Sequence, residues 1–268
     1  MPAYVKKHKE VTYQTTHEDV LLKNGKTDVN GLSKTGTVAY NASHDKIKNG
    51  VKDQYYQSSE LPPYAHSYML TNILSPDYVD RHGDGLTKDD HGNGTTVKYM
   101  KIHDEYGWRT PFEGVNFNEG FKTLHNDDKA SYFYGTKEIY LVESIQNRTS
   151  IAIFSYEDSE AGYGALQKGG IDTSKPMKKL KKISLYSLPE YEANGASATP
   201  IKVAHFTYDY SLCKPKDGKL PNNSGNNDKS GFTNQGGKLT LKSVYFTYGH
   251  SKKGKVSPYI FKYGNNYS

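Results

Sequence analysis

The segment from Asp80 to His91 carries the side chains best suited to bind a cation. Asp80 and Asp84 place two carboxylates in one short loop, and Gly85 follows them where the chain must turn sharply. Oxygen ligands around a glycine turn suit calcium, a hard cation of flexible coordination geometry. The predicted ligands are Asp80, Asp84, the Leu86 carbonyl, Asp89 and Asp90.

The spacing of this loop is similar to that of EF-hand-like and dockerin-like calcium loops, with two departures. His82 stands at the third position, where an oxygen ligand is expected, and His91 stands where the closing carboxylate belongs. One alternative is a turn without metal, in which aspartate side chains accept hydrogen bonds from nearby backbone amides. Another is a transition-metal site formed by His82, Asp84 and His91, because imidazole suits such metals.

A second candidate site is an aromatic insertion near residues 104–134. It contains the only tryptophan of the chain, Trp108, together with Tyr106 and Arg109. Exposed rings beside asparagine and aspartate can stack on sugars, so these three residues form a candidate glycan platform. The alternative is a small satellite core beneath a long loop.

Catalytic motifs of the common enzyme classes are absent from the sequence. The chain has 10 histidines, scattered at positions such as 103, 125 and 205, with no His-Glu-x-x-His, Gly-x-Ser-x-Gly or phosphate-loop pattern. The neighbouring carboxylates Asp127 and Asp128 would face opposite sides of a strand, which does not suit an acid–base pair. The sequence therefore favours a protein that is not an enzyme.

The composition favours a sheet protein. Among 268 residues there are 24 Tyr, 9 Phe and 25 Gly, and the mean hydropathy is −0.83. No long window shows the helical spacing of apolar residues, which excludes a helical bundle. The net charge of +6 is mild, and Lys178–Lys182 is interpreted as the charged edge of a strand rather than as a nucleic-acid site.

Two short patterns recur four times in alternation. The first pattern is an apolar residue, two others, and then Ile or Val; the second is an apolar residue, one other, and then Tyr. The first occurs at Leu70–Ile73, Val142–Ile145, Leu180–Ile183 and Leu241–Val244, and the second at Val97–Tyr99, Phe154–Tyr156, Phe206–Tyr208 and Phe261–Tyr263. Each consecutive pair defines a unit, numbered one to four, that is predicted to form strand, turn and strand.

The expected fold is therefore all-β, with antiparallel β-hairpin repeats that form an extended or curled sheet with long irregular loops. Residues 1–60 are predicted to be an N-terminal strand and turn region, and residues 61–268 the hairpin-repeat region. A flexible loop is expected near 214–238, where the chain is rich in Gly, Asn and Lys.

The remaining signals concern where the chain resides. The single cysteine, Cys213, cannot form an internal disulfide bond, and it is interpreted as a small packed residue. There is no signal-peptide pattern and no apolar run of membrane-spanning length. Because both ends of the sequence run in or near strand-like segments, we expect the chain to belong to a longer protein.

Several stretches resemble a segment of very large surface or exported proteins of Bacteroidota. They are Gln54–Tyr68, Ser75–Asp80, Tyr134–Ile139, Phe206–Cys213 and Gly237–Lys242. The hairpin style is also similar to that of Rhs/YD-repeat and toxin-complex shell proteins. The resemblance implies an extracellular or cell-surface protein without assigned catalytic residues, whose partners are the rest of the polypeptide or neighbouring surface proteins.

Three functions are consistent with these observations. The first is a non-catalytic structural or adhesive surface segment. The second is a carbohydrate-binding β-module, and the third is part of a toxin-associated or glycan-acting enzyme. Calcium is the one candidate cofactor, against the alternative of a turn without metal, and neither nucleic acid nor direct membrane insertion is expected.

Overall fold

The computed structural model describes residues 1–14, 36–38, 40, 55–112, 114–118, 129–212 and 238–264. The region predicted to be a flexible loop, 214–238, lies almost wholly outside these residues, as does Cys213. The strands of the main sheet are β1 (Pro2–Gln14), β2 (Gly36–Val38), β3 (Tyr56–Leu61), β4 (Tyr64–Tyr68), β5 (Asn72–Leu74), β6 (Gly94–Thr110), β7 (Val115–Asn118), β8 (Lys129–Gln146), β9 (Ser150–Asp158), β12 (Lys178–Ser187), β13 (Lys202–Leu212), β14 (Lys238–Thr247) and β15 (Tyr259–Ile260).

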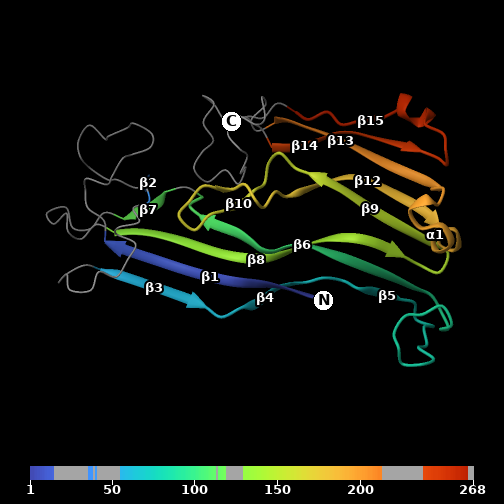
Figure 1. Cartoon of the computed structure of the whole chain (residues 1–268), viewed down its shortest axis with the longest axis horizontal. Coiled ribbons are helices and arrows are strands. Elements are labelled where there is room, and N and C mark those ends of the chain that lie inside the picture. Colours follow the sequence, from blue (N-terminus) through green and yellow to red (C-terminus); the bar gives the residue numbers. More distant parts are fainter. Residues whose placement is uncertain are drawn as a thin grey trace.

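The fold is all-β, as predicted, and the described residues form one 13-stranded sheet whose pairings are antiparallel (Figure 1). The four predicted units are four hairpins: β5 with β6, β8 with β9, β12 with β13, and β14 with β15. They lie side by side, because the second strand of each unit also pairs with the first strand of the next. The hairpin array therefore runs from β5 at one edge to β15 at the other.

The four hairpins share one register. In every unit the last residue of the first pattern pairs with the residue four positions before the tyrosine of the second pattern. These pairs are Ile73 with Thr95, Ile145 with Ala152, Ile183 with Ala204, and Val244 with Tyr259. Because a slip of one residue would turn every side chain to the opposite face, a common register makes the units structurally equivalent.

The N-terminal region belongs to the same sheet. β1 pairs with β8 along one edge and with β3 and β4 along the other. A core lies where β1, β7 and β8 meet, and its largest fully buried side chains are tyrosines and valines, which favour strands. The cluster consists of Val11, Tyr13, Val115, Phe117, Ala130 and Tyr132.

The ribbon formed by β6 and β8 is strongly twisted. In Figure 1, β6 lies below β8 on the right of the picture and above it on the left. The passage coincides with irregular pairing between His103 and Tyr106 of β6, since bulged strands bend and twist more than regular ones. Beyond that point β1 pairs with β8, starting from Val5 opposite Lys137.

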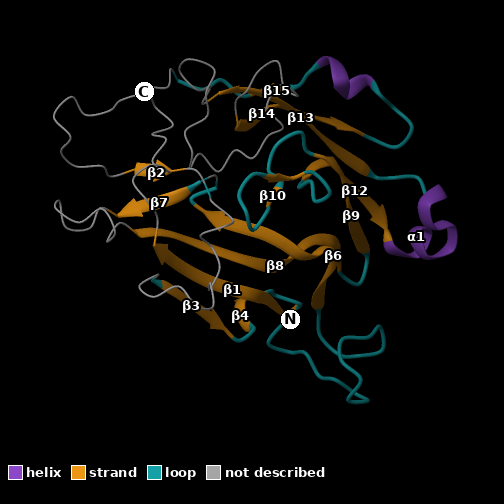
Figure 2. Ribbon diagram, turned by 60° about the vertical axis from the view of Figure 1, so that its left-hand side comes forward, coloured by secondary structure: helices purple, strands orange, loops and turns teal. Residues whose placement is uncertain are grey.

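The segment between β9 and β12 covers the end of β6. It contains a small hairpin of β10 (Gly164–Ala165) and β11 (Ile171–Asp172), which Figure 2 shows beside the large sheet. A Cβ atom on Gly107 of β6 would lie 2.1 Å from the Ala165 carbonyl oxygen, so only glycine permits this approach. Helix α1 (Leu188–Asn194) directly follows β12 and lies in the connection between β12 and β13.

The interpretation of Lys178–Lys182 as a strand edge is wrong. β12 is an interior strand, paired with β9 and β13. The charges of three of its lysines are compensated by ion pairs: Lys178 contacts the Asp158 carboxylate, and Lys179 and Lys181 contact that of Glu157. Since β9 carries Asp158 and Glu157 directly opposite Lys178 and Lys179, the basic run fits inside the sheet.

Candidate functional site

The Asp80 carboxylate holds the acidic loop by hydrogen bonds to the backbone. Its Oδ1 accepts from the amides of His82 and Gly83 at 3.2 and 2.6 Å, and its Oδ2 accepts from Gly85 at 3.0 Å. These amides, above all that of Gly85, hold the pKa of Asp80 below its ordinary value. Gly83 and Gly85 have positive φ angles of 72° and 89°, which glycine adopts without strain.

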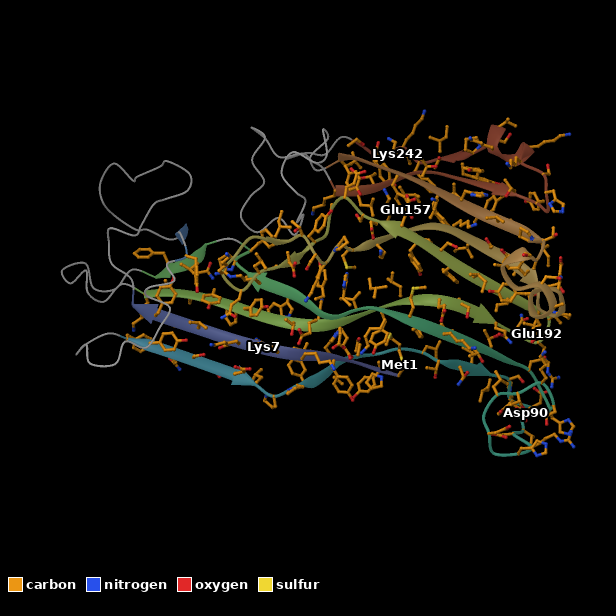
Figure 3. All side chains as sticks on the ribbon, in the orientation of Figure 1. Met1, Lys7, Asp90, Glu157, Glu192 and Lys242 are labelled. Atoms are coloured by element: carbon orange, nitrogen blue, oxygen red, sulfur yellow. The ribbon has the colours of Figure 1, made fainter. Side chains whose placement is uncertain are left out.

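Asp90 is the buried anchor of the same loop, which Figure 3 shows at the lower right. Its carboxylate accepts hydrogen bonds from the amides of Thr87 and Arg81 at 2.8 and 3.0 Å, and from the Tyr78 hydroxyl at 3.0 Å. The two amides are the main reason that the pKa of Asp90 falls to about 2. Burial, followed by the hydrogen bond to Asp90, raises the pKa of Tyr78 to about 12.

The structure brings together some of the predicted metal ligands. Carboxylate oxygens of Asp80, Asp84 and Asp90 lie within 4.8 Å of one another. Asp89 instead contacts His82, with 2.9 Å between Oδ2 and Nε2. The Leu86 side chain packs against Gly94, and its carbonyl stays a predicted ligand. Because backbone amides already occupy the oxygens of Asp80 and Asp90, the geometry is that of a hydrogen-bonded turn, and calcium binding stays a prediction.

The transition-metal alternative is not assembled in this loop. His91 pairs with Val79 through two backbone hydrogen bonds of 3.2 Å, which close the base of the loop. The cluster of carboxylates described above contains Asp84 but neither His82 nor His91. Arg148 donates to the carbonyl oxygens of Lys88 and Asp90 and ties the loop to the turn between β8 and β9.

Trp108 is half-buried and packs against Gly135 of β8 and His8 of β1. It pairs with Gly135 of β8, and Gly135 pairs with His8 of β1. Because a Cβ atom on Gly135 would lie 2.6 Å from the indole ring, the glycine leaves room for the half-buried tryptophan. The His8 ring meets the indole edge-on at 5.2 Å between centroids, and its Nδ1 lies 3.2 Å from the Tyr64 hydroxyl.

The other two residues of the predicted glycan platform contact protein groups. The Tyr106 hydroxyl donates to the Gly162 carbonyl at 2.9 Å, and burial raises the pKa of this tyrosine to about 12. The buried Arg109 donates from Nε to the Gln167 carbonyl at 2.8 Å and lies over the Tyr132 ring, 4.5 Å from its centroid. These contacts tie Tyr106 and Arg109 to the segment between β9 and β12 and to Tyr132 of the core. The satellite core and the glycan platform at Trp108 and its neighbours both stay predictions.

Glu138 is a site that the sequence did not reveal. This buried carboxylate accepts hydrogen bonds from the Tyr4 amide at 3.0 Å and from the Lys101 ammonium at 2.8 Å, and it pairs with Lys6 at 3.1 Å. Lys101, followed by the other donors, lowers the pKa of Glu138 to about 2, and Glu138 in turn raises the pKa of Lys101. These contacts of Glu138 join β1, β6 and β8 at the place where β6 passes across β8.

A second contact that the sequence did not reveal is a hydrogen bond from a tyrosine hydroxyl within the units. In three of them the tyrosine of the second pattern donates to the carbonyl of the first residue of the first pattern. The bonds are Tyr99 to Leu70 at 2.9 Å, Tyr156 to Val142 at 2.8 Å, and Tyr263 to Leu241 at 2.6 Å. In unit three, where both strands carry register shifts, Tyr208 does not make the corresponding bond.

Two further histidines, His103 and His205, each contact other protein groups. His103 contacts the Pro176 carbonyl at 2.8 Å, and His205 stacks on Tyr245 with 4.5 Å between the ring centroids. Burial, followed by the charge of Lys182, lowers the pKa of His205. His125, Asp127 and Asp128 lie outside the described residues.

Comparisons with known proteins gave no relative: no family model, no curated protein and no solved structure matches the chain. Within the described ranges, no helix has the length and apolar character needed to cross a membrane.

Proposed function

We propose that this chain is a non-catalytic structural segment of a larger exported protein, in which hairpin units laid side by side build part of a shell or an adhesive cell-surface layer. Its partners are the rest of that polypeptide or neighbouring surface proteins. The observation that supports the proposal is the equivalence of the three junctions between units. A repeated junction is the means by which repeat proteins build extended surfaces from identical contacts.

The junctions match residue for residue. At each one, the apolar residue of the second pattern pairs with the last residue of the next unit's first pattern, and the tyrosine pairs with its first residue. The pairs are Val97 with Ile145, Phe154 with Ile183, Phe206 with Val244, Tyr99 with Val142, Tyr156 with Leu180, and Tyr208 with Leu241. A register shift lies between or beside the two pairs at every junction.

The pattern residues at these junctions contact one another across the paired strands, which favours a packing role over ligand binding. All twelve are half-buried. Ion pairs flank two of the junctions, with Glu157 contacting Lys181 at 3.1 Å and Asp209 contacting Lys242 at 3.3 Å. Because surface ion pairs contribute little stability, we assign them to fixing the register of the strands.

Truncation after Tyr208 tests the proposal. The shortened chain loses Asp209–Leu212 of β13 together with β14 and β15, and the exposed edge of the remaining β13 should cause aggregation and the loss of a cooperative thermal transition. The measurement is a thermal melt with light scattering, compared with the full chain. A soluble fragment 1–208 that unfolds cooperatively would contradict the stacked-hairpin proposal.

A carbohydrate-binding module is the second candidate, favoured by the row of Trp108, His8 and Tyr64 across β6, β1 and β4. A glycan array with the intact chain separates it from the structural proposal. Specific binding that is lost in Trp108→Ala and retained in Tyr259→Ala, which changes an exposed ring on β15, would support the module. A structural segment predicts no glycan that depends on Trp108.

A further inference from the structure

The two outer edges of the hairpin array expose the pattern residues that are half-buried at every internal junction. At the β5 edge, Leu70 and Ile73 are 56% and 55% exposed. At the β15 edge, Phe261 and Tyr263 are 40% and 47% exposed. β5 pairs only with β6, and β15 only with β14, among the described residues. Each edge therefore presents one half of a junction.

The two halves are complementary to each other. Internal junctions join the second pattern of one unit to the first pattern of the next, always antiparallel. Phe261 and Tyr263 belong to a second pattern that has no following unit in the structure, and Leu70 and Ile73 belong to a first pattern that has no preceding unit. One copy of the chain thus carries both partners of a fourth junction on opposite edges.

We propose that a second copy of this chain completes the junction, so that the segment Tyr259–Tyr263 of one copy, which contains β15, pairs antiparallel with the segment Leu70–Leu74 of the next, which contains β5. The register of the internal junctions places Phe261 opposite Ile73 of the second copy, and Tyr263 opposite its Leu70. This inference rests on the proposed function, since it extends the same structural array from one chain to another. It is a head-to-tail contact, which produces rings or open filaments rather than a closed dimer.

The remaining side chains of the two edges permit this pairing. Between the pattern residues, the β15 edge carries Lys262 and the β5 edge carries Thr71 and Asn72. Lys262 stands where unit one has Lys98, a residue that is exposed at an internal junction, so its charge can remain in water. Since β15 is short, the contact is small, and we expect weak association that grows with protein concentration.

Disulfide cross-linking tests the predicted register. In a Cys213→Ser background, an Ile73→Cys chain is mixed with a Phe261→Cys chain that carries a larger tag, under mild oxidation. Directly opposed residues of antiparallel strands lie about 4.5–5.5 Å apart between Cα atoms, within the range that a disulfide spans. We expect a mixed disulfide dimer to form at least about 10-fold faster than with the control Val256→Cys, because proximity raises the local thiol concentration.

The control residue Val256 is 85% exposed and lies outside the strand, so it offers a more accessible cysteine without the predicted alignment. Equal rates for the two mixtures would overturn the inference. Thermal melts of each variant serve as the control for folding. We expect the array to stay folded, because the substituted side chains are exposed.

Sedimentation velocity of the full chain provides an independent measurement. The average mass should rise with concentration, the rise should disappear in Phe261→Asp, and it should persist in Val256→Asp. A chain that stays monomeric at all concentrations would leave the edge to a hairpin unit of another polypeptide and would overturn the pairing of copies. That result would not affect the structural proposal, which the truncation after Tyr208 tests through an internal junction.

Discussion

Individual side chains in this protein mainly fix how segments distant in the sequence meet. Glu138 illustrates this, because its donors come from the start of β1 and from the middle of β6. No local spacing in the sequence connects Tyr4, Lys101 and Glu138, so their meeting could not be predicted before the passage of β6 across β8 was known. The sequence did predict the neighbourhood of Asp80 and Asp84, because both lie in one short loop.

Glu138→Gln should destabilise the chain by about 2 kcal/mol, since charged hydrogen bonds from a lysine and an amide are weakened. The folded-state pKa of Glu138, about 2, lies below its ordinary value of 4.5. Its stabilising contribution is therefore complete above the ordinary value and is lost as the pH falls toward 2. Melting temperatures of both proteins should differ at pH 6 and converge near pH 2; a gap that is independent of pH would contradict this role.

The acidic loop should be stable without a cation. We expect the melting temperature of the unmodified chain to be the same in excess EGTA and in millimolar calcium. Asp90→Asn should lower it in both buffers, because the buried carboxylate accepts backbone amides. Asp84→Asn is the matched control, since Asp84 accepts no hydrogen bond from the described residues. A calcium-induced rise that vanishes in Asp84→Asn would establish a calcium site instead.

At the scale of the elements, each unit is a hairpin, and in three of the four the tyrosine hydroxyl bonds back to the first strand. The sequence predicted the four hairpins, because apolar and aromatic residues at fixed positions mark strands. The sequence did not predict the hydrogen bonds of the tyrosine hydroxyls. A tyrosine near a strand end can direct its hydroxyl to solvent or to a carbonyl, and the neighbouring residues in the sequence do not decide between the two. Only the shared register, seen in the paired strands, brings Tyr156 to the Val142 carbonyl.

Tyr156→Phe should destabilise the chain by about 1 kcal/mol, because it removes one hydrogen bond from a half-buried site and keeps the ring. Tyr208→Phe is the control, since this half-buried tyrosine of unit three makes no such bond. Urea unfolding of both variants measures the difference. Equal losses of stability for the two would show that the hydroxyl bond contributes nothing specific.

At the scale of the whole molecule, the sequence predicted an array but not how the N-terminal region joins it. Strands of the array pair with their neighbours in sequence, which local patterns can indicate. β1 instead pairs with β8, across more than a hundred residues, and no pattern in residues 1–60 identifies that partner. For the same reason the core could not be predicted from the sequence, because Tyr13 and Tyr132 become neighbours only through the pairing of β1 with β8.

The long-range pairing of β1 has a consequence for synthesis on the ribosome. β3 and β4 can cover one edge of β1 soon after it emerges, but its other edge has to wait until Lys129–Lys137 of β8 has been made. At translation rates of roughly 5–20 residues per second, that wait lasts on the order of 10 seconds. Throughout this interval Val11 and Tyr13 lack their core, so the nascent chain is most open to misassembly at its first strand, whereas each later hairpin finds its neighbour already in place.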